Sequence, residues 1–108
     1  MEFQYILVMV TAPTQEVGEQ IIGMLIEKKL AACVNMISPV NSCYLWQGKS
    51  YEEEEVLLIV KTRAELFEAE IVPAIKSIHP YDVPEIIALT ILMGSQSYLD
   101  WIGEMTER

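Results

Sequence analysis

Few side chains in this sequence can bind a transition metal. His79 is the only histidine, and Cys33 and Cys43 are the only cysteines. Neutral imidazole suits Cu(II), and a thiolate suits Cu(I) or Zn. His79 is therefore the first candidate ligand for copper or another divalent cation, and Cys33 is the second. For each we favour the structural alternative, a hydrogen-bonded turn residue for His79 and a packed thiol for Cys33.

The acidic run Glu52–Glu55 could attract hard cations, which prefer oxygen ligands. It lacks the spaced Asp, Asn and Gly of a calcium loop. We favour a solvated, charged entry to a strand, which also protects the tip of the hairpin from aggregation.

Four aromatic residues have polar tips that suit either a ligand cleft or a subunit interface. They are Tyr44, Trp46, Tyr81 and Trp101. We favour packing in a subunit interface and retain a ligand cleft as the alternative.

Catalytic machinery is not recognisable in the sequence. A nucleophile needs an adjacent base held by a third group, and no such arrangement surrounds any Ser or Cys. The scattered glycines do not form a loop that could cradle phosphate. The sequence therefore predicts a protein that is not an enzyme and has no firmly bound cofactor.

The chain has 108 residues and a formal charge of -9, which predicts a single domain over residues 1–108. The negative charge disfavours nucleic acid as a partner. The longest apolar run, 86–93, is far shorter than the roughly 20 residues of a membrane-spanning helix. Glu2 and Gln4 stand where a secretory signal would carry basic residues. Cys33 and Cys43 share one predicted strand, too far apart for a disulfide, so we expect free thiols and a cytoplasmic location.

The hydrophobic periodicity predicts alternating strands and helices. Thr14 is expected to cap the first helix, Pro39 to cause a bulge or a bend, and Pro73 to kink the second helix. Thr62 with Glu65 is expected to form a capping box for the second helix, whose inner face carries Leu66, Phe67, Ile71, Ile75 and Ile78. Ser97 with Asp100 is expected to cap the final helix. The expected elements are strand 3–11, helix 15–30 with two lysines in its last turn, strand 31–47, a turn at 47–51, strand 56–60, a helix from 62, strand 85–93 and a short terminal helix.

The predicted order is β-α-β-β-α-β, the pattern of an α+β ferredoxin-like sandwich, here with a long hairpin between the second and third strands and a short C-terminal helix. Two crossover helices can cover only one face of a four-stranded sheet. The strands are apolar on both faces, so the uncovered face requires a partner. Self-association is the expected solution, although this reasoning does not fix the number of subunits.

Several segments resemble the CutA divalent-cation-tolerance family in order and spacing. They are Val10–Pro13, Lys29–Asn35, Tyr44–Lys49, Val60–Thr62, His79–Leu89 and Tyr98–Trp101. The resemblance implies a tight homotrimer, similar to PII signalling proteins, built by edge pairing of the long hairpins. It also implies tolerance to copper and other divalent cations. Lys61 and Glu85 lie in the matching segments and join the four aromatic residues as candidate cleft or interface residues.

The metal ligands of one family branch look like a Cys at the position of Val10 and two His at those of Ile78 and His79. Only His79 is kept here. The resemblance therefore implies a homotrimeric divalent-cation-tolerance protein with weak copper or divalent-metal binding. The alternative is a PII-like regulatory trimer that binds a small ligand or a partner protein in its intersubunit clefts, and a third reading is a structural scaffold.

Overall fold

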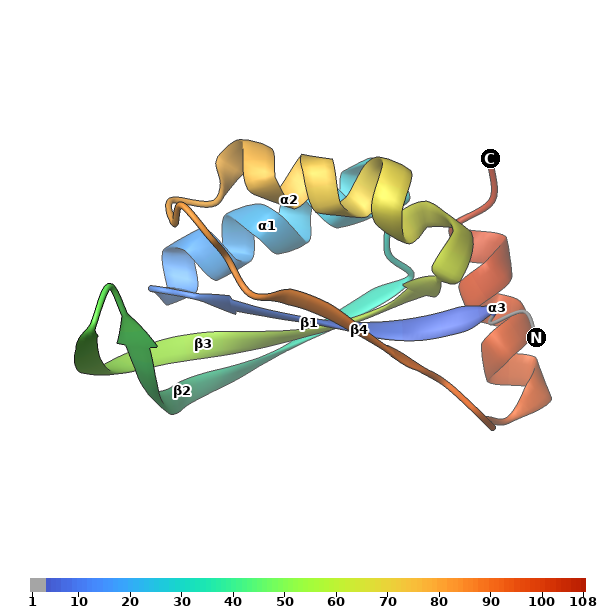
Figure 1. Ribbon diagram of the computed structural model, residues 1–108. Coiled ribbons are helices and arrows are strands. Elements are labelled where there is room, and N and C mark those ends of the chain that lie inside the picture. The colour runs from blue at the N-terminus through green and yellow to red at the C-terminus, as the bar shows by residue number, and fades with distance from the viewer. Residues whose placement is uncertain (1–3) are drawn as a thin grey trace.

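The computed structural model describes residues 4–108, in which four strands form one antiparallel sheet in the order β2-β3-β1-β4. Helices α1 and α2 lie side by side on one face, and α3 lies at the end of the sheet away from the β2-β3 hairpin turn (Figure 1). The elements are β1 Tyr5–Ala12, α1 Gln15–Glu27, β2 Cys33–Trp46, β3 Lys49–Arg63, η1 Ala64–Leu66, η2 Phe67–Ile71, α2 Val72–Ile78, β4 Ile86–Thr90 and α3 Gln96–Met105. The predicted order of strands and helices is confirmed. The predicted start of the first strand, at Phe3, lies outside the described residues.

The core lies between the sheet and the two covering helices. Val8 and Val10 of β1 are fully buried, as are Leu25 of α1 and Ile75 of α2. Alternate residues of a strand point to opposite faces, so the residues between the buried ones on β1 face away from the helices. Those residues are only partly buried.

The uncovered face of the sheet is apolar, as the sequence predicts. In register across β3, β1 and β4 it carries Ile59, Met9 and Ile87, which are direct neighbours. Ile87 and Leu89 are each 51% exposed. We call this surface the bare face; its apolar members are Ile37, Leu57, Ile59, Leu7, Met9, Ile87 and Leu89.

Helix α1 begins as predicted and ends earlier than predicted. The Thr14 hydroxyl accepts a hydrogen bond from the Val17 N–H at 3.2 Å, which confirms the N-cap. The predicted end at Leu30 is wrong, because Lys29 adopts a left-handed conformation with φ of 56°. The N–H of Leu30 then bonds the Leu25 carbonyl at 2.8 Å, an arrangement that closes the helix. Both lysines expected in the last turn lie beyond it.

The β2-β3 hairpin is longer on its second strand than expected. A two-residue turn at Gln47 and Gly48, both with positive φ, joins the strands. Strand β3 begins at Lys49 rather than at Val56, so the acidic run lies within it. The register shifts between Ile37 and Val40, which confirms the bulge expected near Pro39.

The second helical segment differs from the prediction. The Thr62 hydroxyl donates to the Leu30 carbonyl at 2.7 Å instead of capping a helix, and Glu65 pairs with Arg63. The predicted capping box is therefore wrong. The chain passes through a 3-10 turn and a π-turn, and Pro73 lies in the first turn of α2, where its missing N–H costs no helical bond. Ile78, expected on the inner face, is 40% exposed.

The C-terminal part also starts and stops at other residues than expected. Strand β4 ends at Thr90, and Met93 is 84% exposed. Ser95 occupies the N-cap of α3 without a side-chain cap bond, and Asp100 accepts from the Gln96 amide at 2.9 Å. The predicted Ser97 and Asp100 cap is therefore wrong. No helix within residues 4–108 is both long and apolar enough to cross a bilayer.

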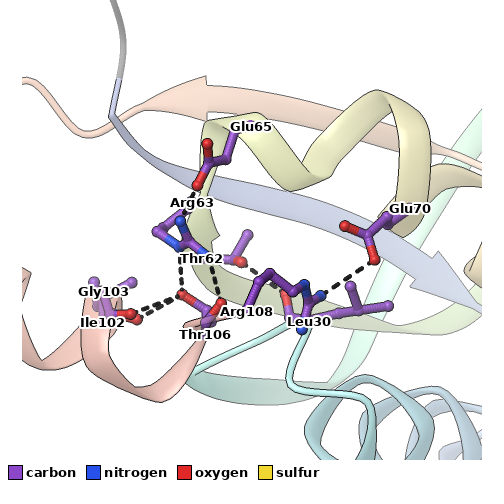
Figure 2. A network of polar contacts seen from close by, with 9 residues as sticks. All are labelled: Leu30, Thr62, Arg63, Glu65, Glu70, Ile102, Gly103, Thr106 and Arg108. Carbon is purple, nitrogen blue, oxygen red and sulfur yellow. Dashed lines mark hydrogen bonds and ion pairs between the residues drawn. The ribbon is translucent and has the colours of Figure 1, made fainter.

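Two arginines tie the end of α3 to the rest of the fold (Figure 2). Arg63 donates from Nε to the Thr106 hydroxyl at 2.9 Å, and also bonds the Thr106 carbonyl and Glu65. Arg108 reaches the Lys28 carbonyl at 3.2 Å and Glu70 at 3.4 Å. We call the network of Arg63, Glu65 and Thr106 the clasp.

Candidate ligand groove

A groove of about 800 Å³ opens between the β2-β3 hairpin and the loop that follows α2. The hairpin contributes an aromatic and polar wall, and the loop contributes a proline-rich wall that starts after His79. The lining residues are Thr11, Asn41, Ser42, Cys43, Tyr44, Trp46, Glu55, Pro80, Tyr81, Asp82, Val83, Pro84 and Glu85. Four of the predicted cleft residues, Tyr44, Trp46, Tyr81 and Glu85, meet here.

Glu55 and Tyr81 join the two walls of the groove. Glu55 is only 6% exposed, and its Oε2 accepts a hydrogen bond from the Tyr81 hydroxyl at 2.7 Å. Burial and then this hydrogen bond raise the pKa of Tyr81 above its ordinary value, because both favour the neutral phenol. The prediction that all of 52–55 is solvated is therefore wrong at Glu55, while Glu52, Glu53 and Glu54 are exposed.

Tyr44 lies on the hairpin side of the groove. Its ring stacks on Tyr51 of β3, with ring centroids 5.5 Å apart and planes 17° from parallel. Partial desolvation, then a hydrogen bond and charge repulsion from Glu53, raise the pKa of the Tyr44 phenol. The phenols of Tyr44 and Tyr51 and the acidic side chains of β3 thus form one acidic and aromatic surface.

His79 links strand β1 to the loop that forms one wall of the groove. It is 7% exposed; its Nε2 lies 2.8 Å from the Thr11 carbonyl oxygen, and its Nδ1 lies 3.2 Å from the Tyr81 N–H. The carbonyl can only accept and the N–H can only donate, so these partners assign a neutral ring with its proton on Nε2. Both ring nitrogens are occupied. This is the geometry of the turn residue that we favoured over the metal ligand.

The two metal candidates are not brought together. Cys33 lies opposite Lys61 in the β2-β3 ladder, whereas His79 bonds Thr11, which is in register with Leu57. Within residues 4–108 no three His, Cys, Asp or Glu side chains cluster as a metal site. Cys33 and Cys43 are free thiols, as predicted.

Two predicted cleft residues lie outside the groove. Lys61 donates to the Asn35 side chain on the bare face. Trp101 lies on α3 with its ring 5.6 Å from that of Tyr98. Burial, and then the neighbouring Cys33 side chain, raise the pKa of the Tyr98 phenol. Lys61, Cys33, Tyr98 and Trp101 therefore belong to the bare face and the end of the sheet beside α3.

Sequence reasoning missed Glu55 and Asp82 as groove residues. The signal for Asp82 was present, because it stands between two prolines that hold an extended loop. Glu55 gives no such local signal, since it is one of four consecutive glutamates. Its burial depends on the packing of the loop at 80–85 against the hairpin.

Comparison with known proteins gives a consistent result. The model of the CutA1 divalent ion tolerance protein family matches residues 6–105. The divalent-cation tolerance protein CutA of Thermus thermophilus is 45% identical over 100 residues, which is 93% of this chain and 96% of that protein. The chloroplastic Protein CutA 1 of Oryza sativa is 46% identical over 94% of this chain, but this chain spans only 56% of it. The structure of the periplasmic divalent cation tolerance protein CutA from Archaeoglobus fulgidus superposes with a TM-score of 0.92 at 44% identity, over 95% of this chain and 99% of that one.

Proposed function

Because the chain belongs to the CutA1 divalent ion tolerance family, we propose that it acts in divalent-cation tolerance as a PII-like homotrimer. Each protomer is one ferredoxin-like domain over residues 1–108, and the role is not catalytic. The observation that carries the proposal is the bare face. Monomeric proteins rarely expose a continuous apolar surface of more than a few hundred Å².

The edges of the sheet favour the same assembly. Strands β2 and β4 each have one neighbour, so one side of each strand has backbone groups free to pair. The β2-β3 hairpin is long enough to extend past its own sheet, and the protomer measures 44 Å along its longest axis. Edge pairing of hairpins would satisfy these backbone groups while it covers the bare face.

Metal binding would then draw on the assembled protein. His79 would supply a nitrogen and Cys33 a sulfur, and neither belongs to a group of three or more possible metal ligands within the described protomer. Copper at His79 would have to displace one of two hydrogen bonds. We therefore expect weak binding of copper or another divalent cation, with donors contributed by more than one subunit.

Titration calorimetry of the assembled protein with Cu(II) tests this arrangement. We expect measurable heat for the wild type, a loss of most of it in His79→Ala, and a smaller loss in Cys33→Ser. Cys43→Ser is the matched control, because it removes the other thiol. Identical curves for the wild type and His79→Ala would contradict the proposed ligand.

A second candidate function, regulation by a small ligand, is favoured by the groove. Its volume of about 800 Å³ falls within the range of ligand sites, roughly 300 to 1,000 Å³. Its walls combine aromatic rings with a few polar groups, as such sites do. A nucleotide panel and a metal panel titrated into the same protein would separate the two candidates, since in a Trp101→Phe background Trp46 is the only tryptophan of the sequence and its fluorescence reports occupancy of the groove.

We place the protein in the cytoplasm, on the basis of its two free thiols. The rice relative is named chloroplastic and the Archaeoglobus protein periplasmic, so location varies among similar proteins. Fractionation with an antibody against the chain would test the assignment. Recovery with secreted proteins would contradict it.

A further inference from the structure

We propose that the groove binds an organic cation of the protonated amine class, with Glu55 as its counter-charge and the rings of Tyr44, Trp46 and Tyr81 around it. The inference rests on the second candidate function, ligand binding in this groove, and names the chemistry of that ligand.

The charge of the groove selects a cation. Its ionisable lining residues include the carboxylates of Glu55, Asp82 and Glu85, and none of its lining residues is Lys, Arg or His. The chain as a whole carries a formal charge of -9. A concave surface with one sign of charge concentrates the opposite ion and repels its own. A nucleotide or another phosphate ester is therefore a poor fit.

Glu55 is the anchoring group. Its side chain is almost entirely withdrawn from water, and the Tyr81 hydroxyl fixes one carboxylate oxygen at 2.7 Å. A fixed carboxylate of low exposure attracts a cation more strongly than a mobile surface carboxylate does, because water screens it less. Tyr81 is itself held by the bond from its N–H to His79. The anchor is thus in position before a ligand arrives.

The walls distinguish an organic cation from a metal ion. Hard metal ions take six or more oxygen ligands at close range, and the described residues gather no such cluster. Tyr44 and Trp46 are each 39% exposed and line the same cavity as Tyr81, together with two prolines. Aromatic faces attract ammonium groups, and their apolar rings favour the attached carbon atoms. An amine can use both the carboxylate and the rings, whereas a hydrated metal ion cannot use the rings.

The test compares a charged probe with its uncharged isostere on the assembled protein. Benzylamine, protonated at neutral pH, and benzyl alcohol have nearly the same shape. We expect benzylamine to bind at least about tenfold more tightly, with quenching or a shift of Trp46 fluorescence read in a Trp101→Phe background. Equal affinity for the two probes would overturn the proposal.

Two variants locate the charge. Glu55→Gln keeps an oxygen that can accept from Tyr81 and removes the negative charge, so it should weaken benzylamine binding about tenfold or more and leave benzyl alcohol unchanged. Glu54→Gln removes a charge from the adjacent, exposed position and should bind as the wild type does. If Glu55→Gln does not fold, Asp82→Asn, at an exposed lining residue, should still weaken benzylamine selectively. An unchanged affinity in these variants would overturn the proposal.

The same titrations distinguish failure of the amine proposal from failure of ligand binding in the groove. Binding of a nucleotide or of magnesium in the groove without benzylamine would overturn the amine class and leave ligand binding in place. Absence of binding by benzylamine, nucleotides and metal ions alike would overturn both.

Discussion

The two ends of strand β3 differ in how far the same chain covers their side chains. At its C-terminal end the Arg63 side chain is only 17% exposed, and its guanidinium bonds Thr106 and Glu65 of the same chain. At its other end Tyr51 is 37% exposed, beside Tyr44 and Trp46 at 39% each. The first end is closed within one protomer. The second leaves aromatic surface to be covered by a ligand or another subunit.

The same contrast separates the two faces of the sheet. Val8 and Val10 of β1 are fully buried beneath the helices, while Leu7 and Met9, which alternate with them along the strand, remain partly exposed. Apolar burial contributes about 25 cal/mol per Å², so covering the bare face provides a driving force that the protomer leaves unused. Stability of the protomer and the proposed assembly therefore depend on different surfaces.

The largest effect is expected from a charge on the bare face. Ile59→Asp should leave the protomer folded and abolish association, because the new carboxylate would have to be buried unpaired in the interface. Gln20→Asp adds the same charge on the exposed side of α1 and should associate normally. Light scattering after size exclusion gives the mass of each variant. Normal association of Ile59→Asp would show that the bare face is not an interface.

The clasp should control stability rather than assembly. Arg63→Ala removes charged hydrogen bonds and leaves the Thr106 carbonyl without them, so we expect a loss of about 3 kcal/mol in the free energy of unfolding. Arg108→Ala breaks an exposed pair and should cost less than about 1 kcal/mol. Urea denaturation measures both values. Equal losses would contradict the assignment of the clasp as the stronger of the two ties at this end of the fold.

Substitution of Trp46 tests the role of the exposed aromatic surface at the hairpin end of β3. Trp46→Ala should weaken association by about 2 kcal/mol, the cost commonly seen when an aromatic anchor is truncated at an interface. Leu45→Ala changes the neighbouring residue, which points to the opposite side of the strand, and serves as the control. Sedimentation at decreasing protein concentration reveals the shift. An unchanged dissociation constant for Trp46→Ala would assign Trp46 to the groove alone.

The smallest effect concerns pH. The pKa of Tyr81 is raised in the folded protein, so above the ordinary value, about 10, the unfolded state loses this proton first. Stability is therefore fully present below that pH and falls as pH rises further. Tyr81→Phe has no such proton and should show a smaller alkaline loss of stability. Denaturation curves at neutral and alkaline pH compare the two proteins, and parallel losses would contradict the assigned cause.

Local patterns predicted the order of the elements, the Thr14 cap, the bulge near Pro39 and the free thiols. These features depend on residues close in sequence or on strand periodicity. The capping box at Thr62 failed because long-range partners, the Leu30 carbonyl and Arg63, take its two side chains.

The candidate site was predictable only in part. The aromatic residues and Glu85 stood out by type and by resemblance. Glu55 did not, because its burial depends on contact between the hairpin and a loop 25 or more residues away, in which Tyr81 supplies the bond. The preference for a structural role of His79 matches the observed bonds, which link segments 68 residues apart.

The mass of the wild-type protein in solution tests the central claim most directly. Sedimentation equilibrium at micromolar concentration should give three times the chain mass of 12.3 kDa, because the bare face favours self-association and the proposed assembly is a homotrimer. A stable monomer at that concentration would contradict the account, since the apolar face of the sheet would then be exposed to water without a partner.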